Sequence, residues 1–232
     1  MKHMCWLPLA ALLAAESCGR LPGKPKAGAE VPRPDSILDP VVLYSANCAG
    51  CHGAEGTDGP AMALADPVYL TIADDNTLRS VIAEGRPGTA MSAFAQKAGG
   101  TLTDEQIDSI VRGIRDRWGG RSSLRSGTTP PYVSHALGDA QHGEAVYATF
   151  CAQCHGTGER GGPKAGSVTN PTYLRLISDQ GLRTIVIAGR PDFGAPDWRG
   201  NVAGRPMSDQ DISDVVAWLS SQRVNSFPES TN

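Results

Sequence analysis

The chain contains the pentapeptide Cys48-Ala-Gly-Cys51-His52 and, 103 residues later, the pentapeptide Cys151-Ala-Gln-Cys154-His155. Both follow the pattern Cys-x-x-Cys-His. With 6 cysteines and 5 histidines in 232 residues, chance produces this pattern about 0.003 times per chain. The two copies therefore indicate a specific chemistry that the chain uses twice.

Four kinds of site contain a Cys-x-x-Cys pair: a structural disulfide, a thioredoxin-like redox pair, half of a zinc site and a covalent haem attachment site. A thioredoxin-like pair needs a β-α-β context, which is missing around both motifs. A zinc site needs further ligands close by, and only His135 and His142 remain outside the N-terminal segment and the motifs. Haem attachment explains every motif residue, because the thiols add to the porphyrin vinyl groups and the histidine reaches one axial face of the iron. We expect two covalently attached haem c groups, held by Cys48, Cys51 and His52 and by Cys151, Cys154 and His155.

The two motifs lie in a duplicated segment. Matching stretches recur at shifts of 103 to 105 residues: Gly59-Pro60 with Gly162-Pro163, Leu78–Pro87 with Leu182–Pro191, and Thr103–Ile107 with Ser208–Ile212. Each repeat has about ninety residues, enough for a small domain whose core a haem completes. We expect two small haem-binding domains at 38–118 and 139–226, a polar Gly/Pro-containing linker at 119–138 and a C-terminal tail at 227–232.

Helical patterns run through both repeats, and no alternating strand pattern of useful length accompanies them. A short helix is expected before each motif, and a middle helix around Thr77–Glu84 and Gly181–Ala188. Each repeat should end in an amphipathic helix, with Thr103 or Ser208 as its N-cap. The expected fold class is all-α, with two tandem small helical domains.

The N-terminal segment predicts export. An uncharged stretch ending at Ala15 is too short to span a bilayer permanently. Small residues at Ala15 and Ser17 favour cleavage before Cys18, so residues 1–17 are expected to form a signal peptide. Cys18 would then be the lipidated first residue of a Pro/Gly-rich tether at 18–37, and simple secretion is the alternative. The expected location is the periplasmic side of the membrane, with Cys18 as the anchor.

The composition excludes one class of partner and limits the size of the core. The formal net charge is -3 and no run of Lys or Arg occurs, so we expect no nucleic-acid binding. Gly (27) and Pro (17) are abundant, whereas aromatic residues make up 6%. A loop-rich globular protein of this kind has a thin apolar core that a large cofactor can complete.

On these motifs the chain resembles class I cytochrome c domains, in the arrangement of the bacterial two-haem, two-domain cytochromes c. In that family a Gly on the N-terminal helix is followed four residues later by an aromatic residue, and four residues after that by the first motif cysteine. Gly143 and Tyr147 precede the second motif with this spacing, whereas Pro40 replaces the Gly in the first repeat, so the helix crossing there should differ. The resemblance also implies that the carbonyls of Pro60 and Pro163 accept the ring N–H of the motif histidines, unless each Gly-Pro pair only forms a turn.

The family's sixth iron ligand is a methionine on the loop before the final helix. In the first repeat Met91 has this position, with Met62 as its rival. In the second repeat the aligned residue is Ala195, which cannot bind iron. We therefore expect Met207 as a displaced ligand; the alternatives are a hydrophobic staple at the helix start and an iron without this ligand. Weaker candidates are His142 and Lys164.

The resemblance implies a carrier of single electrons between membrane or periplasmic respiratory partners, from a quinol-oxidising complex towards a terminal oxidase. The chain would act alone or as a subunit of such a complex. The alternative is a haem enzyme, peroxidase-like or a small-molecule dehydrogenase, with an open second haem, and Ala195 is its only support. Because the sequence shows no catalytic constellation, we expect an electron-transfer protein rather than an enzyme.

Overall fold

The computed structural model describes residues 31–121, 129–158 and 160–223. Residues up to Ser36 form one unit, whose described part contains the 3-10 helix η2 (Pro34–Ser36), and residues from Ile37 onward form a second unit. The expected signal peptide, the Cys18 anchor, most of the tether and the C-terminal tail lie outside the described residues.

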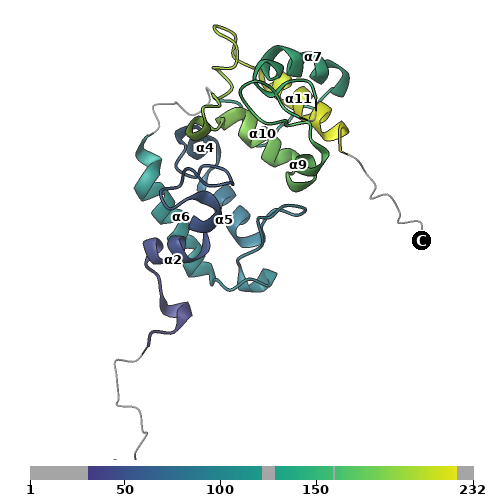
Figure 1. Ribbon diagram of the computed structural model, residues 1–232. Coiled ribbons are helices and arrows are strands. Elements are labelled where there is room, and N and C mark those ends of the chain that lie inside the picture. Colours follow the sequence, from purple (N-terminus) through teal and green to yellow (C-terminus); the bar gives the residue numbers. More distant parts are fainter. Residues whose placement is uncertain (1–30, 122–128, 159, 224–232) are drawn as a thin grey trace, which may run out of the picture. The chain divides into compact units, whose positions relative to one another are not determined.

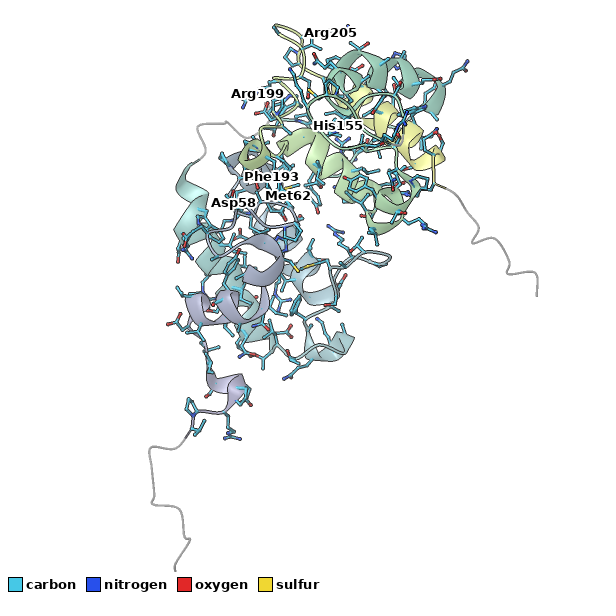
Figure 2. All side chains as sticks on the ribbon, viewed as in Figure 1. Asp58, Met62, His155, Phe193, Arg199 and Arg205 are labelled. Atoms are coloured by element: carbon cyan, nitrogen blue, oxygen red, sulfur yellow. The ribbon has the colours of Figure 1, made fainter. Side chains whose placement is uncertain are left out.

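Helices build the second unit, and its two repeats have the same order of helices (Figure 1). The first repeat contains α2 (Pro40–Asn47), α3 (Ala49–His52), α4 (Pro67–Ile72), α5 (Asp75–Glu84) and α6 (Asp104–Trp118), and the second contains α7 (Ala140–Phe150), α8 (Ala152–His155), α9 (Pro171–Leu176), α10 (Asp179–Ala188) and α11 (Asp209–Ser221). Three further 3-10 helices are η3 (Gln96–Ala98), η4 (Gly119–Arg121) and η5 (Pro191–Phe193). Figure 2 labels His155, which lies on α8. The all-α class is confirmed, and within the described ranges none of the helices is long and apolar enough to cross a membrane.

The final helices begin where the sequence predicts. The N–H of Gln106 donates to the Thr103 hydroxyl at 3.2 Å, and the N–H of Thr103 donates to the Gln106 side chain at 3.0 Å. Ser208 and Asp211 form the same reciprocal box at the start of α11, with distances of 3.0 and 2.9 Å. Such a box satisfies two backbone donors that have no partner within the helix.

Two short helices, α4 and α9, were missed by the sequence analysis. Each begins with a proline that follows a polar N-cap, Asp66 or Asn170, whose side chain accepts backbone N–H groups of the first turn. Proline is favoured at this place because its missing N–H would have no helical partner. With six residues each, these helices carry little periodic signal, so the N-cap and the proline were the available signs.

The core of each repeat lies where its first long helix crosses its last. α2 packs on α6, and α7 packs on α11. In the first crossing the edge of Tyr44 meets Trp118, with ring centres 5.2 Å apart. In the second, Tyr147 lies 4.5 Å from Trp218, again between ring centres. These aromatic pairs fix the helices that carry the two motifs.

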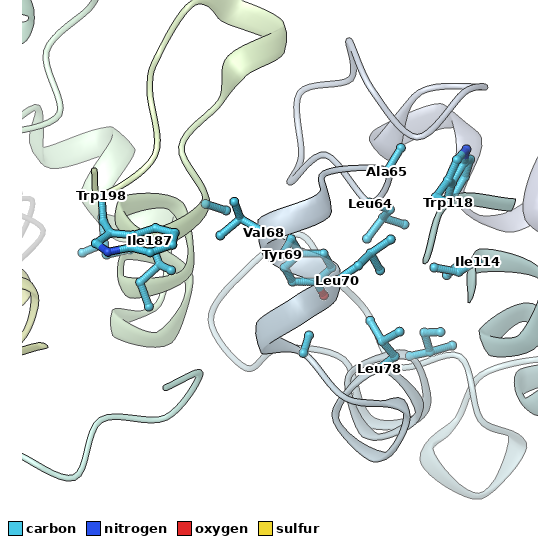
Figure 3. Packing of buried hydrophobic residues seen from close by; sticks show 14 of the residues in the cluster. Leu64, Ala65, Val68, Tyr69, Leu70, Leu78, Ile114, Trp118, Ile187 and Trp198 are labelled. Atoms are coloured by element: carbon cyan, nitrogen blue, oxygen red, sulfur yellow. The ribbon is translucent and has the colours of Figure 1, made fainter. Parts of the chain in front are cut away.

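The middle helices complete the core. Figure 3 shows Leu70 of α4 and Leu78 of α5 near Ile114 of α6, all of them buried. In the second repeat the Trp198 ring lies against Ile187 of α10, and the Trp198 N–H donates to the Ile187 carbonyl at 3.2 Å. The loop that follows α10 is therefore fastened back onto that helix.

The two helix crossings achieve close approach with different residues. In the second repeat Gly143 lies against α11, where a Cβ atom would be 2.0 Å from the Asp214 carbonyl oxygen. In the first repeat Pro40 has the position of Gly143, and Gly113 on α6 makes room for it: a Cβ atom at Gly113 would be 2.5 Å from the Pro40 Cβ. The expected difference at Pro40 is thus confirmed. The glycine that permits close approach lies on the last helix in the first repeat and on the first long helix in the second repeat.

Candidate haem-binding sites

Both motifs lie on a helical turn that directly follows the first long helix. Cys48 ends α2, and Cys51 and His52 belong to α3, where the His52 N–H donates to the Cys48 carbonyl at 3.0 Å. Positions i, i+3 and i+4 of a helix share one side, so the two thiols and the imidazole project together. The second motif has the same backbone angles at its first cysteine and the same 3.0 Å bond.

A backbone carbonyl fixes the orientation of each motif histidine. His52 Nδ1 lies 2.7 Å from the Met62 oxygen, and His155 Nδ1 lies 2.7 Å from the Gly166 oxygen; Figure 2 labels Met62 and His155. Because a carbonyl only accepts, Nδ1 carries the proton and donates it. The lone pair of Nε2 then remains free for a metal, which is the form that an iron ligand requires. The residues present therefore fit a haem.

The two carbonyls are not those predicted, at Pro60 and Pro163. They belong to residues two and three positions further along the chain. The reason is that the chain bends at the Gly-Pro pair and lies directly against the motif. The Ala61 N–H donates to the Cys51 carbonyl at 3.0 Å, and the second repeat has a matching bond to the carbonyl of its second motif cysteine. The chain passes the imidazole only after this turn. The predicted carbonyls were wrong: at both places the chain only bends at the Gly-Pro pair, and a later residue supplies the acceptor.

A tyrosine holds the loop that follows each motif. The hydroxyl of Tyr44 donates to the Gly53 carbonyl at 2.8 Å, and that of Tyr147 donates to the Gly156 carbonyl at 2.6 Å. Burial raises the pKa of both tyrosines to about 12, so the hydroxyls stay protonated donors at neutral pH. The glycines have φ angles of 82° and 68°, which only glycine adopts readily. The chain can therefore turn immediately after each histidine.

The four motif cysteines form no disulfide with one another. Burial raises the pKa of Cys48 to about 11 and that of Cys151 to about 12. A thioredoxin-like nucleophile has the opposite property, a lowered thiol pKa, so these values argue against that alternative. Across residues 31–121, 129–158 and 160–223, no group of three or more His, Cys, Asp or Glu could hold a metal ion.

The loop before the final helix starts with the same turn in both repeats. After α5 the Arg86 N–H donates to the Met91 carbonyl at 2.8 Å, and after α10 the Arg190 N–H donates to the Ala195 carbonyl at 2.9 Å. Ala195 therefore occupies the place of Met91, as the alignment of the repeats predicts.

Met207 occupies the place of Leu102. The Met207 N–H donates to the Trp198 carbonyl at 2.9 Å, and the Leu102 N–H donates to the Phe94 carbonyl at 2.8 Å. Both side chains precede a helix N-cap and are buried, with 3% and 5% of their surface exposed. The Asn201 amide nitrogen lies 3.9 Å from the Met207 sulfur. This packing favours the staple alternative for Met207 over the displaced ligand.

The Gly-Arg-Pro turn of the second repeat contacts the loop that holds His52. The Arg190 guanidinium donates to the Gly59 carbonyl at 2.8 Å and to Asp192 at 2.7 Å, and Asp192 accepts the N–H of Asp58 at 3.1 Å. Burial and then the charge of Arg190 lower the pKa of His52, which keeps its ring neutral. No residue type in the sequence marks this contact, because its main acceptor is a backbone carbonyl.

Comparison with known proteins gives three findings. The family described as cytochrome C oxidase, cbb3-type, subunit III matches at residues 35–112 and 138–219, one segment for each repeat. The cbb3-type cytochrome c oxidase subunit CcoP of Azospirillum brasilense is 30% identical over 139 residues, which cover 53% of this chain and 40% of that protein, so the match spans less than half of the relative. A chain of the Kuenenia stuttgartiensis reducing HAO-like protein complex Kustc0457/Kustc0458 has 18% identity and a TM-score of 0.50, covering 84% of this chain and 100% of that one; this likeness concerns the fold alone.

Proposed function

Since the chain belongs to the family of cbb3-type cytochrome c oxidase subunit III, and is thus an electron-transfer cytochrome with covalently bound haem c, we propose that it carries electrons on two such haems. The observation that carries the proposal is the pair of 2.7 Å bonds from the motif histidines to backbone carbonyls. These bonds hold both imidazoles in the tautomer whose Nε2 is free to bind iron, which supports haem binding in both repeats. The proposed domains are 38–118 and 139–226.

The residues of each motif have defined roles in this proposal. The two thiols would form thioether bonds to the haem, and Nε2 of the histidine would bind the iron. A bound haem supplies reversible one-electron exchange at its iron. In the first repeat Met91 would provide the sixth ligand, on a loop fixed by the bond from Arg86 to the Met91 carbonyl. The prolines Pro60 and Pro163 would form the turn beside the haem.

The proposed partners are respiratory. Methionine ligation raises the potential of a haem, which suits electrons that leave a quinol-oxidising complex and travel towards a terminal oxidase. The similarity to an oxidase subunit supports the oxidase end of this path. The chain would act as a carrier or as a subunit of such a complex, on the periplasmic side of the membrane and anchored through a lipidated Cys18.

Reoxidation by membranes tests this function. The purified protein is reduced, freed of reductant and mixed in air with membranes from cells that contain or lack their terminal oxidase, while the absorbance of the reduced haem is followed. We expect reoxidation to be faster with membranes that contain the oxidase than with membranes that lack it or with buffer alone. The proposed path would be contradicted if the oxidase did not increase the rate.

A further inference from the structure

The second repeat lacks a donor atom where the first repeat has a thioether. The N–H bond that closes the turn before Met91 recurs before Ala195, from the arginine of the Gly-Arg-Pro turn, with lengths of 2.8 and 2.9 Å. The second turn also contains η5 and a return bond from the Ala195 N–H to the Arg190 carbonyl at 2.9 Å. Both turns also begin with a glycine at positive φ, 68° at Gly85 and 72° at Gly189. The backbone is therefore retained and the ligand is not, because the alanine methyl group has no lone pair to offer iron.

The packing of Met207 does not favour it as a replacement for the lost thioether. Its N–H bond to Trp198 matches the bond of Leu102 to Phe94, and an apolar side chain suffices at that place in the first repeat. The Met207 side chain is 3% exposed and belongs to the hydrophobic core. The Met207 sulfur has the Asn201 amide nitrogen as its polar neighbour, at 3.9 Å.

The remaining candidates in the second repeat are engaged elsewhere. His142 Nδ1 lies 2.7 Å from the Asp214 carboxylate, where α7 crosses α11. Lys164 is exposed and lies in the loop between the motif and Gly166, whose carbonyl holds His155. Lys164 thus belongs to the loop that orients the motif histidine.

We propose that the iron of the second site has no protein side chain as its sixth ligand and binds small diatomic molecules of the carbon monoxide class, while Met91 closes the first site. The proposal rests on the proposed attachment of haem at both motifs. Ala195 lacks the side-chain atoms that Met91 has beyond Cβ, so no thioether takes the sixth position there. The binding step moves no electron between protein and ligand: the carbon lone pair forms a bond to ferrous iron, and no bond of the protein breaks.

Carbon monoxide titration of the reduced, fully loaded protein tests this assignment. The haem content is measured first, so that a missing second haem is distinguished from a closed one. We expect about one carbon monoxide per chain in the native protein, from the difference spectrum. Ala195→Met should abolish this binding and add a second thioether–iron band to the oxidised spectrum. Met91→Ala should raise the stoichiometry to about two.

Met207→Leu is the matched control, because leucine is the residue that the first repeat uses at that place. This variant should bind the same amount of carbon monoxide as the native protein, with an unchanged oxidised spectrum. The proposal is overturned if the native protein with two haems binds none and Met207→Leu binds about one, since Met207 would then be the ligand. Native protein and Met207→Leu that both bind none would overturn it as well. Should Ala195→Met fail to fold, Met91→Ala and Met207→Leu still decide between these outcomes.

Discussion

Gly143 on α7 lies so close to Asp214 on α11 that a Cβ atom at Gly143 would be 2.0 Å from the Asp214 carbonyl oxygen. The neighbour is backbone, which cannot rotate away as a side chain can. We predict that Gly143→Ala forces the helices apart and lowers the free energy of unfolding by about 1–3 kcal/mol. Urea unfolding of the oxidised protein, followed by circular dichroism, measures this change.

Gly158→Ala is the control for that substitution. Gly158 lies in the same repeat, and a Cβ atom there would meet nothing within 4 Å. Its unfolding midpoint should match that of the native protein. An unchanged midpoint for Gly143→Ala would show that the helices separate at no cost in free energy. This result would contradict the claim that the close approach of α7 and α11 requires Gly143.

His142 and Asp214 make the same crossing sensitive to pH. Their side chains lie 2.7 Å apart, and the hydrogen bond to Asp214 raises the pKa of His142 above its ordinary 6.5. The pair therefore contributes fully to stability below pH 6.5, and this contribution is lost as the pH rises through the raised pKa. Burial alone would raise the pKa of Asp214, but hydrogen bonds from Asp139, His142 and Gln210 lower it below 3.8. The Asp214 contribution is present above pH 3.8 and is lost as the pH falls through the lowered value.

His142→Gln removes the titrating partner and tests this dependence. The native protein should lose stability relative to the variant as the pH is raised from about 6 to about 8.5. Urea unfolding at a series of pH values gives the difference. A difference that stays constant over this range would mean that the His142 charge does not contribute.

Met91→Ala should change the first haem and leave the second unaltered. Because Met91 is the only thioether ligand in this account, the thioether–iron charge-transfer band should disappear and one potential should fall. Met62→Leu is the control, since His52 is held by the backbone carbonyl of Met62 and this survives the substitution. A band that persists in Met91→Ala, or is lost in Met62→Leu, would assign the ligand to another methionine.

Cys18→Ser tests the proposed anchor. If Cys18 carries the lipid, the variant should leave the membrane fraction and appear in the soluble periplasmic fraction, because acyl chains supply the membrane affinity. Immunoblots of the two fractions measure the distribution. A native protein already found in the soluble fraction would contradict lipid anchoring.

Much of the architecture could be predicted because it depends on side chains whose identity can be read in the sequence. The Cys-x-x-Cys-His motifs and the shift between repeats predicted tandem helical cytochrome c domains, and the capping residues Thr103 and Ser208 marked the last helices. The sequence also shows that Ala195 of the second repeat aligns with Met91 of the first, since the segments directly before them match closely.

The sequence could not predict features made by the backbone. The acceptors for His52 and His155 are carbonyls, which every residue possesses, so no residue type marks Met62 or Gly166. For Met207, side-chain chemistry and packing favour different roles: a thioether can bind iron, but the packing places the residue where the first repeat has Leu102.

Acid–acetone extraction followed by potentiometric titration of the purified protein tests whether the chain carries two covalent haems. We expect that extraction leaves all haem on the polypeptide, and that titration shows two one-electron steps of about equal amplitude, with the higher potential lowered by Met91→Ala. A single one-electron step with one haem per chain, or about one equivalent of extractable haem, would contradict it.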